Sequence, residues 1–575
     1  MKQNQKPEDL KMYQFTAEEL LEGYTPMEGL NQNPPRILSI EDIATPSPLV
    51  RVSCSFEDGP DPQFNIYLPP KEQWEGRFFQ RVHPWIHIDE IQNIEFYLDN
   101  GGYTITVPQF TMGYLHHAAA AHVSRTIAKN YYEYSGKIYG YIYGGSGGSM
   151  LVIGALEASV GLVWDGAVPF ITAAPTSLAN FDIRRFARIV LEEKAPLIAD
   201  AVRPGGSGDP YAVLNDLECD ILREVTLLGL PLRAWENYEY LFIMQENPEL
   251  IDNLNATGEV NEAYTYAFWN EPGYLEAYDP ELRSIFYNLR DRGVSEGALA
   301  KIAYHRHKDP GPTFYTWNHL RDSNGDPLFA QTPGIHFAIE TALMTSGGAL
   351  WNGNINYKTI TVVNLLDQDS FPSDGDYYRE RVKEMDREDD FYFWLNDNAD
   401  HNALHDESFP YLNARLIDYE GIINQALLDL SAWVENDVKP PNSTAYNVVD
   451  SQLIFTDNTA ARGGIQPIVE LTVDGAVRTS ITSGSSVNLS AKIRVPLNTG
   501  EIVSVEWDYL GDGNFARADY DTLPDGSWSA NSNYTYNEEG TYLPSVRVAS
   551  QRDGDPETPF TRAYNHGRAR VIVSE

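Results

Sequence analysis

The sequence predicts an α/β fold with two additions, a large and mainly helical insertion and an all-β domain after it. Buried strand patterns alternate with helix patterns over residues 1–172 and again over residues 336–438, which indicates a mostly parallel sheet covered by helices on both faces. Between these two parts, residues 173–335 have a mainly helical and aromatic pattern. Over residues 465–575, short alternating strands separated by turn residues indicate a small sandwich.

The strands of the predicted sheet are short runs rich in Val, Ile, Phe and Tyr, bounded by turn residues. In order, they fall at residues 48–53, 64–68, 77–82, 103–107, 138–143, 162–170, 359–364 and 391–395. Residues 115–132 predict a helix because a run of alanines, which have the highest helix propensity, lies in the middle. Further helices are expected from Met150, at residues 338–345, and at residues 421–434, where an amphipathic pattern ends this part of the chain.

The segment 173–335 is too long for a loop, so the sequence predicts a unit of its own there. Its helices are expected at residues 210–230, 234–245 and 280–292. Its position in the chain suggests a cap over the functional edge of the sheet. Residues 439–464, which begin with Lys-Pro-Pro-Asn-Ser-Thr, are expected to form a linker.

The composition excludes several classes of partner. Acidic residues outnumber basic ones by 82 to 42, a formal net charge of −40, and phosphate binding needs a basic surface, so we expect no nucleic-acid partner. No run of 18 apolar residues occurs, and the first residues contain no apolar signal-peptide core, so we expect no membrane span and no visible signal peptide. Cys54 and Cys219 form no metal-ligand pattern and could be free or paired. We expect no cofactor.

A glycine cluster surrounds one serine between the strand at 138–143 and the following helix. Gly144-Gly145-Ser146-Gly147-Gly148 fits the G-x-S-x-G nucleophile elbow, whose cramped turn requires small residues two positions before and after the serine. Ser149 does not fit, because Leu151 follows it by two positions. The alternatives are an ordinary glycine-rich turn or a phosphate cradle, although no G-x-x-x-x-G-K-[ST] motif is present.

A nucleophilic serine needs a base, and the base needs an orienting group. In hydrolases with this elbow, the acid and then the histidine follow the serine along the chain. Asp367 comes just after one predicted strand, with Asp369 as the alternative acid, and His401 comes just after the last predicted strand. His405 could compete, and with His401 it has the spacing of a zinc helix, but the glutamate and a third ligand are missing, so we expect no metal.

The oxyanion formed during acyl transfer needs two backbone donors. One is expected to be the N–H of Gly147, the residue after the serine. The other should come from the loop His83-Pro84-Trp85, which follows the strand at 77–82. Proline has no N–H, so the second donor is His83 or Trp85.

Three stretches resemble the tannase/feruloyl esterase group of α/β-hydrolases: Trp-Glu-Gly-Arg-Phe-Phe-Gln at 74–80, the elbow itself, and Trp-Asp-Gly-Ala-Val-Pro at 164–169. The resemblance covers roughly residues 70–172 and 355–405 and implies an α/β-hydrolase core and ester hydrolysis. In that group a disulfide joins cysteines beside the serine and the histidine, whereas Gly145 and Asn402 occupy those places here. The glycine-rich oxyanion loop is also replaced, so specificity for gallate or ferulate is not implied.

The C-terminal residues resemble a PKD (polycystic kidney disease-type) domain, an immunoglobulin-like sandwich. The matching residues are Trp-Asp-Tyr at 507–509, Gly-Asp-Gly at 511–513 and Glu-Gly-Thr-Tyr at 539–542. The resemblance implies a secreted or periplasmic enzyme, otherwise a cytoplasmic one, and a module that acts as a spacer or contacts glycans or proteins. Asp508 and Asp512 could bind calcium or form a tight turn.

Together these features predict a serine hydrolase that cleaves a carboxylic ester through an acyl-enzyme. The aromatic insertion suggests a small-molecule or oligomeric ester substrate that is bulky or aromatic and neutral. The alternatives are a peptidase on the same scaffold, or a catalytically inactive protein for binding or adhesion.

Overall fold

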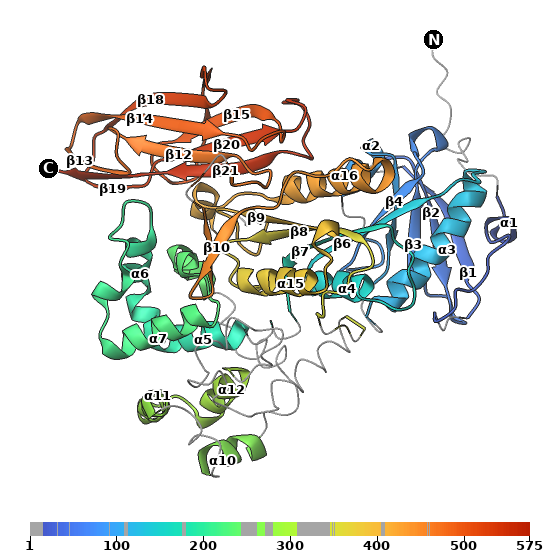
Figure 1. The fold of residues 1–575 in the computed structure, drawn as a ribbon, viewed down its shortest axis with the longest axis horizontal. Coiled ribbons are helices and arrows are strands. Elements are labelled where there is room, and N and C mark those ends of the chain that lie inside the picture. The colour runs from blue at the N-terminus through green and yellow to red at the C-terminus, as the bar shows by residue number, and fades with distance from the viewer. Residues whose placement is uncertain are drawn as a thin grey trace.

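The structure is a computed structural model of the 575-residue chain. It describes all residues except 1–14, 31–32, 45–46, 85, 91–92, 109–112, 175–176, 178–179, 243–261, 271–279, 307–345, 348, 350, 404–408, 457 and 459–460. The predicted fold class is confirmed: an α/β-hydrolase core with a helical insertion is followed by an all-β sandwich (Figure 1).

The core is a nine-stranded sheet in the order β1-β2-β3-β5-β4-β6-β7-β8-β9. The strands are β1 (Arg36–Ile43), β2 (Leu49–Ser55), β3 (Phe64–Leu68), β4 (Arg77–Arg81), β5 (Gly102–Thr106), β6 (Tyr139–Ser146), β7 (Gly166–Thr172), β8 (Lys358–Asn364) and β9 (Phe391–Asn396). The first three strands form an antiparallel extension, while β5, β4, β6, β7, β8 and β9 are parallel. The carboxyl ends of these six strands therefore lie along one edge.

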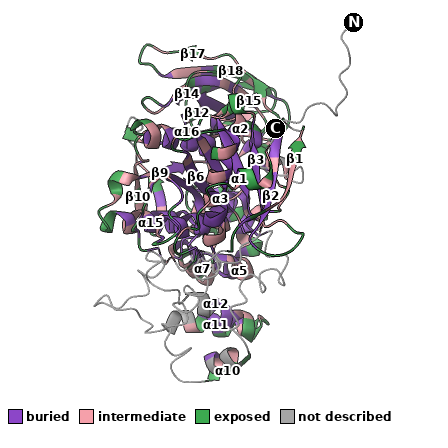
Figure 2. Ribbon diagram, turned by 90° about the vertical axis from the view of Figure 1, so that its right-hand side faces the viewer, coloured by how far each residue is buried: buried purple, intermediate pink, exposed green. Residues whose placement is uncertain are grey.

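Helices cover both faces of this sheet. On one face lie α3 (Leu115–Tyr131), α4 (Gly147–Leu156) and α15 (Pro372–Glu384), and on the other lie α2 (Ile94–Asp99) and α16 (Glu420–Asn436). Successive strand residues point to opposite faces, so Phe78 packs in the first core and Phe79 in the second. The central parallel strands β7 and β8 are accordingly buried along almost their whole length, as Figure 2 shows.

The insertion has a hydrophobic core of its own, built around Phe186, Trp235 and Phe286. Its described helices are α5 (Asn180–Leu191), α6 (Ala195–Val202), α7 (Asp216–Leu227), α8 (Tyr238–Leu241), α10 (Glu262–Asn270), α11 (Pro280–Asp291) and α12 (Glu296–Arg306), together with the 3₁₀ turn η6 (Leu232–Asn237). The helix expected at residues 338–345 lies outside the described residues. A separate core supports treating this segment as a unit.

The segment 439–464 contains a hairpin that its composition did not indicate. Strands β10 (Tyr446–Val449) and β11 (Gln452–Phe455) are joined by Asp450 and Ser451, both with positive φ, as a two-residue type I′ turn requires. The Tyr446 hydroxyl bonds to Asp376 on α15. This segment is therefore packed on the core rather than extended between domains.

The sandwich spans residues 468–574. Its strands are β12 (Ile468–Val473), β13 (Arg478–Thr482), β14 (Ser485–Arg494), β15 (Glu501–Asp508), β16 (Ala516–Arg517), β17 (Asp521–Thr522), β18 (Trp528–Tyr536), β19 (Gly540–Tyr542), β20 (Ser545–Gln551), β21 (Ala563–Arg568) and β22 (Arg570–Ser574). Asp508 accepts backbone N–H bonds from Leu510, Gly511 and Gly513, which favours the tight turn over a calcium ligand.

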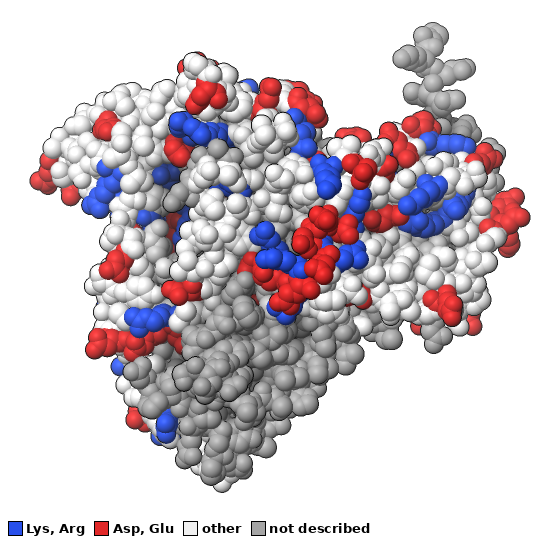
Figure 3. Space-filling view, viewed as in Figure 1, with Lys and Arg blue, Asp and Glu red and all other residues white. Residues whose placement is uncertain are grey.

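Other expectations concern the whole chain. Cys54 and Cys219 are both free thiols. No helix in the described residues has the length and apolar character needed to cross a bilayer. On the face shown in Figure 3, acidic and basic side chains lie interspersed.

Candidate active site

Ser146 occupies a strained turn between β6 and α4. It is the last residue of the strand and the N-cap of the helix, with φ 53° and ψ −123°. A Cβ on Gly144 would lie 2.4 Å from the Val82 carbonyl oxygen, and a Cβ on Gly148 would lie 2.2 Å from the same atom. The positions two before and two after the serine therefore have no room for a side chain, as a nucleophile elbow requires.

Ser149, the other serine of the cluster, has a structural role. It is fully buried, its Oγ donates to the carbonyl oxygen of Ser146 at 2.6 Å, and the same Oγ accepts from the N–H of Ala173 at 2.9 Å. These two bonds join the start of α4 to the end of β7.

His401 and Asp367, which follow neighbouring strands, are in direct contact. The imidazole Nδ1 lies 2.9 Å from Asp367 Oδ1 and 3.1 Å from Oδ2. An ionised carboxylate can only accept, so Nδ1 carries the proton and Nε2 is left to accept one. Asp367 has no exposed surface, and its Oδ1 also accepts the backbone N–H bonds of Asp369 and Ser370.

The electrostatics of this pair favour the charged imidazole. Burial lowers the pKa of His401, but the carboxylates of Asp367, Asp369 and Asp400 outweigh it and raise that pKa to about 9. Burial raises the pKa of Asp367, and the neighbouring imidazole opposes that effect. The arrangement therefore stabilises a positive charge on His401. A histidine base acquires such a charge when it takes the proton of a serine.

Asp369, the alternative acid, lies beside the other ring nitrogen. Its Oδ2 is 3.9 Å from His401 Nε2, and its carboxylate forms an ion pair with Arg184 of α5. Arg184 is completely buried and also donates to the carbonyl oxygen of Leu241. Asp369 thus joins the insertion to the sheet edge, whereas Asp367 makes the hydrogen bond to Nδ1.

The loop after β4 packs on the start of α4. A Cβ on Gly147 would lie 2.9 Å from the Pro84 ring, and a Cβ on Gly148 would lie 3.4 Å from His83 Cα. Gly147 is the first residue of α4, so its N–H has no acceptor within the helix. Burial lowers the pKa of His83 to about 4, with further lowering by Arg81 and by His401. Trp85, the other candidate donor, lies outside the described residues.

Ser146 and His401 lie at the same edge without a direct bond. Ser146 ends β6, and β7 and β8 separate that strand from β9, which leads to His401. In the described part of the chain, no hydrogen bond joins the Ser146 hydroxyl to the imidazole. Catalytic hydrogen bonds are often long without substrate and shorten in the reactive complex.

Several supporting residues were missed at the level of sequence. Asn364 and Asn396 end β8 and β9 in register, and Asn396 Nδ2 donates to Asn364 Oδ1 at 3.0 Å. Asn364 Nδ2 in turn donates to the carbonyl oxygen of Asp400, and the Tyr419 hydroxyl donates to that of His401. The sequence signal that could have identified these residues was an asparagine at the equivalent last position of two consecutive strands.

Among the residues that the structure describes, no group of three or more His, Cys, Asp or Glu side chains could hold a metal ion.

Comparison with known proteins gives two kinds of match. The PKD domain family matches residues 470–556. Among solved structures, an esterase from Aspergillus oryzae is 14% identical with a TM-score of 0.36, and the alignment covers 76% of this chain and 93% of that one. Tannin acyl hydrolase from Aspergillus niger is 12% identical (TM-score 0.36; 79% and 92% covered), and feruloyl esterase B from Aspergillus oryzae is 13% identical (TM-score 0.35; 73% and 91% covered). No curated protein sequence matches the chain. Residues 470–556 therefore form a C-terminal PKD domain, and the solved structures similar to the chain include a tannin acyl hydrolase and a feruloyl esterase.

Proposed function

We propose that the chain is a serine hydrolase that cleaves carboxylic esters, with Ser146 as nucleophile, His401 as base and Asp367 as the orienting acid. The observation that supports this most directly is the buried contact between Asp367 and His401 Nδ1, at the sheet edge where Ser146 occupies a strained elbow. Ser146 ends one parallel strand of the sheet, and Asp367 and His401 each follow another, which is how distant segments are brought to one site.

In the proposed reaction, Ser146 Oγ attacks the ester carbonyl carbon while His401 Nε2 takes its proton. The N–H of Gly147, together with that of His83 or Trp85, stabilises the oxyanion. The C–O bond to the alcohol then breaks as His401 returns the proton to the leaving oxygen, and an acyl-enzyme remains. Water, deprotonated by His401, releases the acid and restores the serine.

We propose an apolar or aromatic neutral substrate, because apolar and aromatic side chains gather beside the orienting acid. Leu366, next to the acid, packs with Leu412 and Leu416, and Tyr240 of α8 and Phe409 border this cluster. The rings of Tyr240 and Phe409 meet edge to face at 5.8 Å. Burial raises the pKa of Tyr240, and Asp400 and Asp369 raise it further, so carboxylates lie near this aromatic surface and would repel an anionic substrate. We also propose that the helical insertion is a cap over this edge of the sheet. The PKD domain supports a proposed location of the protein outside the cytoplasm.

The test of this function is covalent labelling. A fluorophosphonate probe should label the intact protein at one residue, and the label should map to Ser146 by peptide mass spectrometry. Ser146→Ala should abolish labelling because the attacking hydroxyl is lost. Labelling that persists in this variant, or a wild-type protein that neither labels nor hydrolyses p-nitrophenyl esters, would contradict the proposal. Faster turnover of amides than of esters would instead indicate a peptidase.

The rate of ester hydrolysis should rise with pH. His401 must be neutral to accept the serine proton, and neighbouring carboxylates raise its pKa to about 9, so kcat/KM should increase through that pH in the free enzyme. Asp369→Asn removes one of these negative charges and should shift the rise to lower pH. A profile of kcat/KM between pH 5 and 10 for both proteins checks this, and an identical midpoint in both would contradict it.

A further inference from the structure

The sandwich contacts the loop that follows β9 and ends at His401. We call its residues 397–401 the histidine loop. Asn398 Nδ2 donates to Asn565 Oδ1 at 2.9 Å and to the carbonyl oxygen of His566 at 3.1 Å, and both partners lie on β21 of the sandwich. Asn398 and Asn565 are 4% and 3% exposed. Asn565 is itself held, because its Nδ2 donates to the carbonyl oxygen of Pro467 at 2.7 Å.

The backbone of the histidine loop is held to the same strand through Gln466. Its Oε1 accepts from the N–H of Asp397 at 2.8 Å, and its Nε2 donates at 3.0 Å to the carbonyl oxygens of both Asp397 and Tyr564. One side chain thus joins the loop backbone to β21. The hydrogen bonds of Gln466 thus hold the histidine loop at Asp397, one residue before the bonds made by Asn398.

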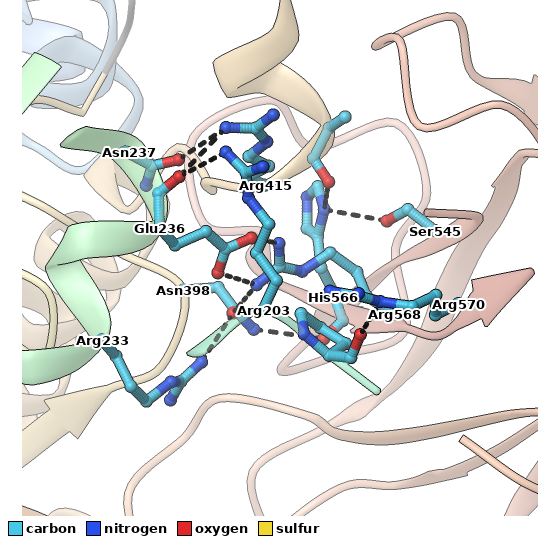
Figure 4. Close-up of polar contacts among 12 residues, drawn as sticks. Arg203, Arg233, Glu236, Asn237, Asn398, Arg415, Ser545, His566, Arg568 and Arg570 are labelled. Atoms are coloured by element: carbon cyan, nitrogen blue, oxygen red, sulfur yellow. Dashed lines mark hydrogen bonds and ion pairs between the residues drawn. The ribbon is translucent and has the colours of Figure 1, made fainter. Parts of the chain in front are cut away.

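The insertion contacts the histidine loop from another side (Figure 4). Arg233 of η6 pairs with Asp397 at 2.7 Å and lies 3.3 Å from Asn398 Oδ1. Glu236 of the same turn forms a buried ion pair with Arg568 at the end of β21. The core, the insertion and the sandwich therefore meet at this loop.

The contacts hold Asn398 in a conformation that most residues avoid. Its φ is 51°, in the left-handed region, which asparagine tolerates better than other non-glycine residues. Such backbone strain persists only where the surroundings enforce it. His401 follows only three residues later, so the direction in which the chain leaves Asn398 affects where its imidazole lies.

We propose that the sandwich is part of the catalytic unit, and that Asn565 is a positioning residue that acts through Asn398 to hold the histidine loop and aim His401 at Ser146. This inference rests on the proposed serine hydrolase function. It assigns the sandwich a role in the reaction, beyond the spacer or the glycan or protein contact that its resemblance implied.

The test compares two alanine substitutions in the intact chain. Asn565→Ala removes the acceptor for Asn398, whereas Asn533→Ala removes an exposed asparagine of β18 whose Nδ2 donates to Asn488. We expect Asn565→Ala to lower kcat by about 10- to 100-fold with KM little changed, because small displacements of catalytic groups have effects of this size. Asn533→Ala should retain the wild-type kcat. Asn565→Asp keeps the acceptor for Asn398 but loses the donor to Pro467 and buries a charge, so it should recover only part of the rate.

A cycle with Asn398 tests whether the two asparagines act together. Asn398→Gly removes the side chain but permits the positive φ, and it should lower kcat as Asn565→Ala does. The double variant should be no slower than the slower single variant, since either change breaks the same bond. Additive losses, or a lower melting temperature with unchanged kcat, would overturn the proposal.

Hydrogen exchange separates this inference from the proposed function. The measurement needs no turnover, so it can be made in proteins that also carry Ser146→Ala. In that background Asn565→Ala should increase the rate of amide exchange over residues 397–402, and Asn533→Ala should not. If the wild-type protein has no esterase activity but this difference appears, the proposed function fails and the ordering of the loop by the sandwich stands. Equal exchange in both variants overturns the inference, whether or not the enzyme is active.

Discussion

Replacing Ser146 with alanine should lower kcat for a p-nitrophenyl ester by about 10⁴- to 10⁶-fold, the effect of removing a catalytic nucleophile. The substitution removes one oxygen from a side chain that is only partly exposed, and the elbow glycines and α4 are unaffected. The positive φ at this position strains serine and alanine alike, so the fold should survive. The measurement is kcat under saturating substrate, with thermal unfolding to show that the variant is folded.

Ser149→Ala is the matched control for this prediction. The change is chemically the same and lies three residues away, but it removes the two hydrogen bonds that join α4 to β7. We therefore expect a loss of about 1–3 kcal/mol in the free energy of unfolding from the buried groups left unpaired, with kcat within about tenfold of wild type. A Ser146→Ala protein that keeps more activity than Ser149→Ala would refute the assignment of the nucleophile.

The positions of the candidate site residues were predictable because they follow buried strands. In a parallel sheet both faces are covered, so a central strand such as β8 is a short continuous apolar run, which sequence reveals. A polar residue just beyond such a run is then at the carboxyl edge by topology alone. This reasoning placed Asp367 and His401 at neighbouring strand ends, and the structure has them in contact.

The contacts around these residues were not predictable in the same way. Arg184 and Asp369 are separated by 185 residues, and Asn398 and Asn565 by 167, so no local spacing relates them. The hairpin of β10 and β11 follows a proline-rich start, and its strands are too short for a clear alternation. Such features depend on how the units pack, which periodicity and turn residues do not encode.

The two acids should give different results when each is changed to asparagine. In Asp367→Asn, the amide oxygen should keep the place of Oδ1, because two backbone N–H groups donate to it. The amide nitrogen would then replace Oδ2, 3.1 Å from His401 Nδ1, and compete with the amide oxygen, 2.9 Å away, for that ring nitrogen. Donation by the amide nitrogen favours the tautomer with the proton on Nε2, which cannot accept the serine proton, and the charge that stabilises the imidazolium is lost in either tautomer. We expect kcat to fall by about 10⁴-fold, the effect of such a tautomer change in a triad.

Asp369→Asn is the matched comparison, with the same chemical change two residues along the loop. Its amide oxygen can still accept from Arg184, but the charge that compensates this fully buried guanidinium is lost. We expect the free energy of unfolding to decrease by about 1–3 kcal/mol while kcat stays within about tenfold of wild type, because no bond to Nδ1 changes. Chemical denaturation and kcat for both variants distinguish the roles. If Asp369→Asn lost activity and Asp367→Asn kept it, the acid that acts on His401 would be Asp369, and the buried contact at Nδ1 would be structural.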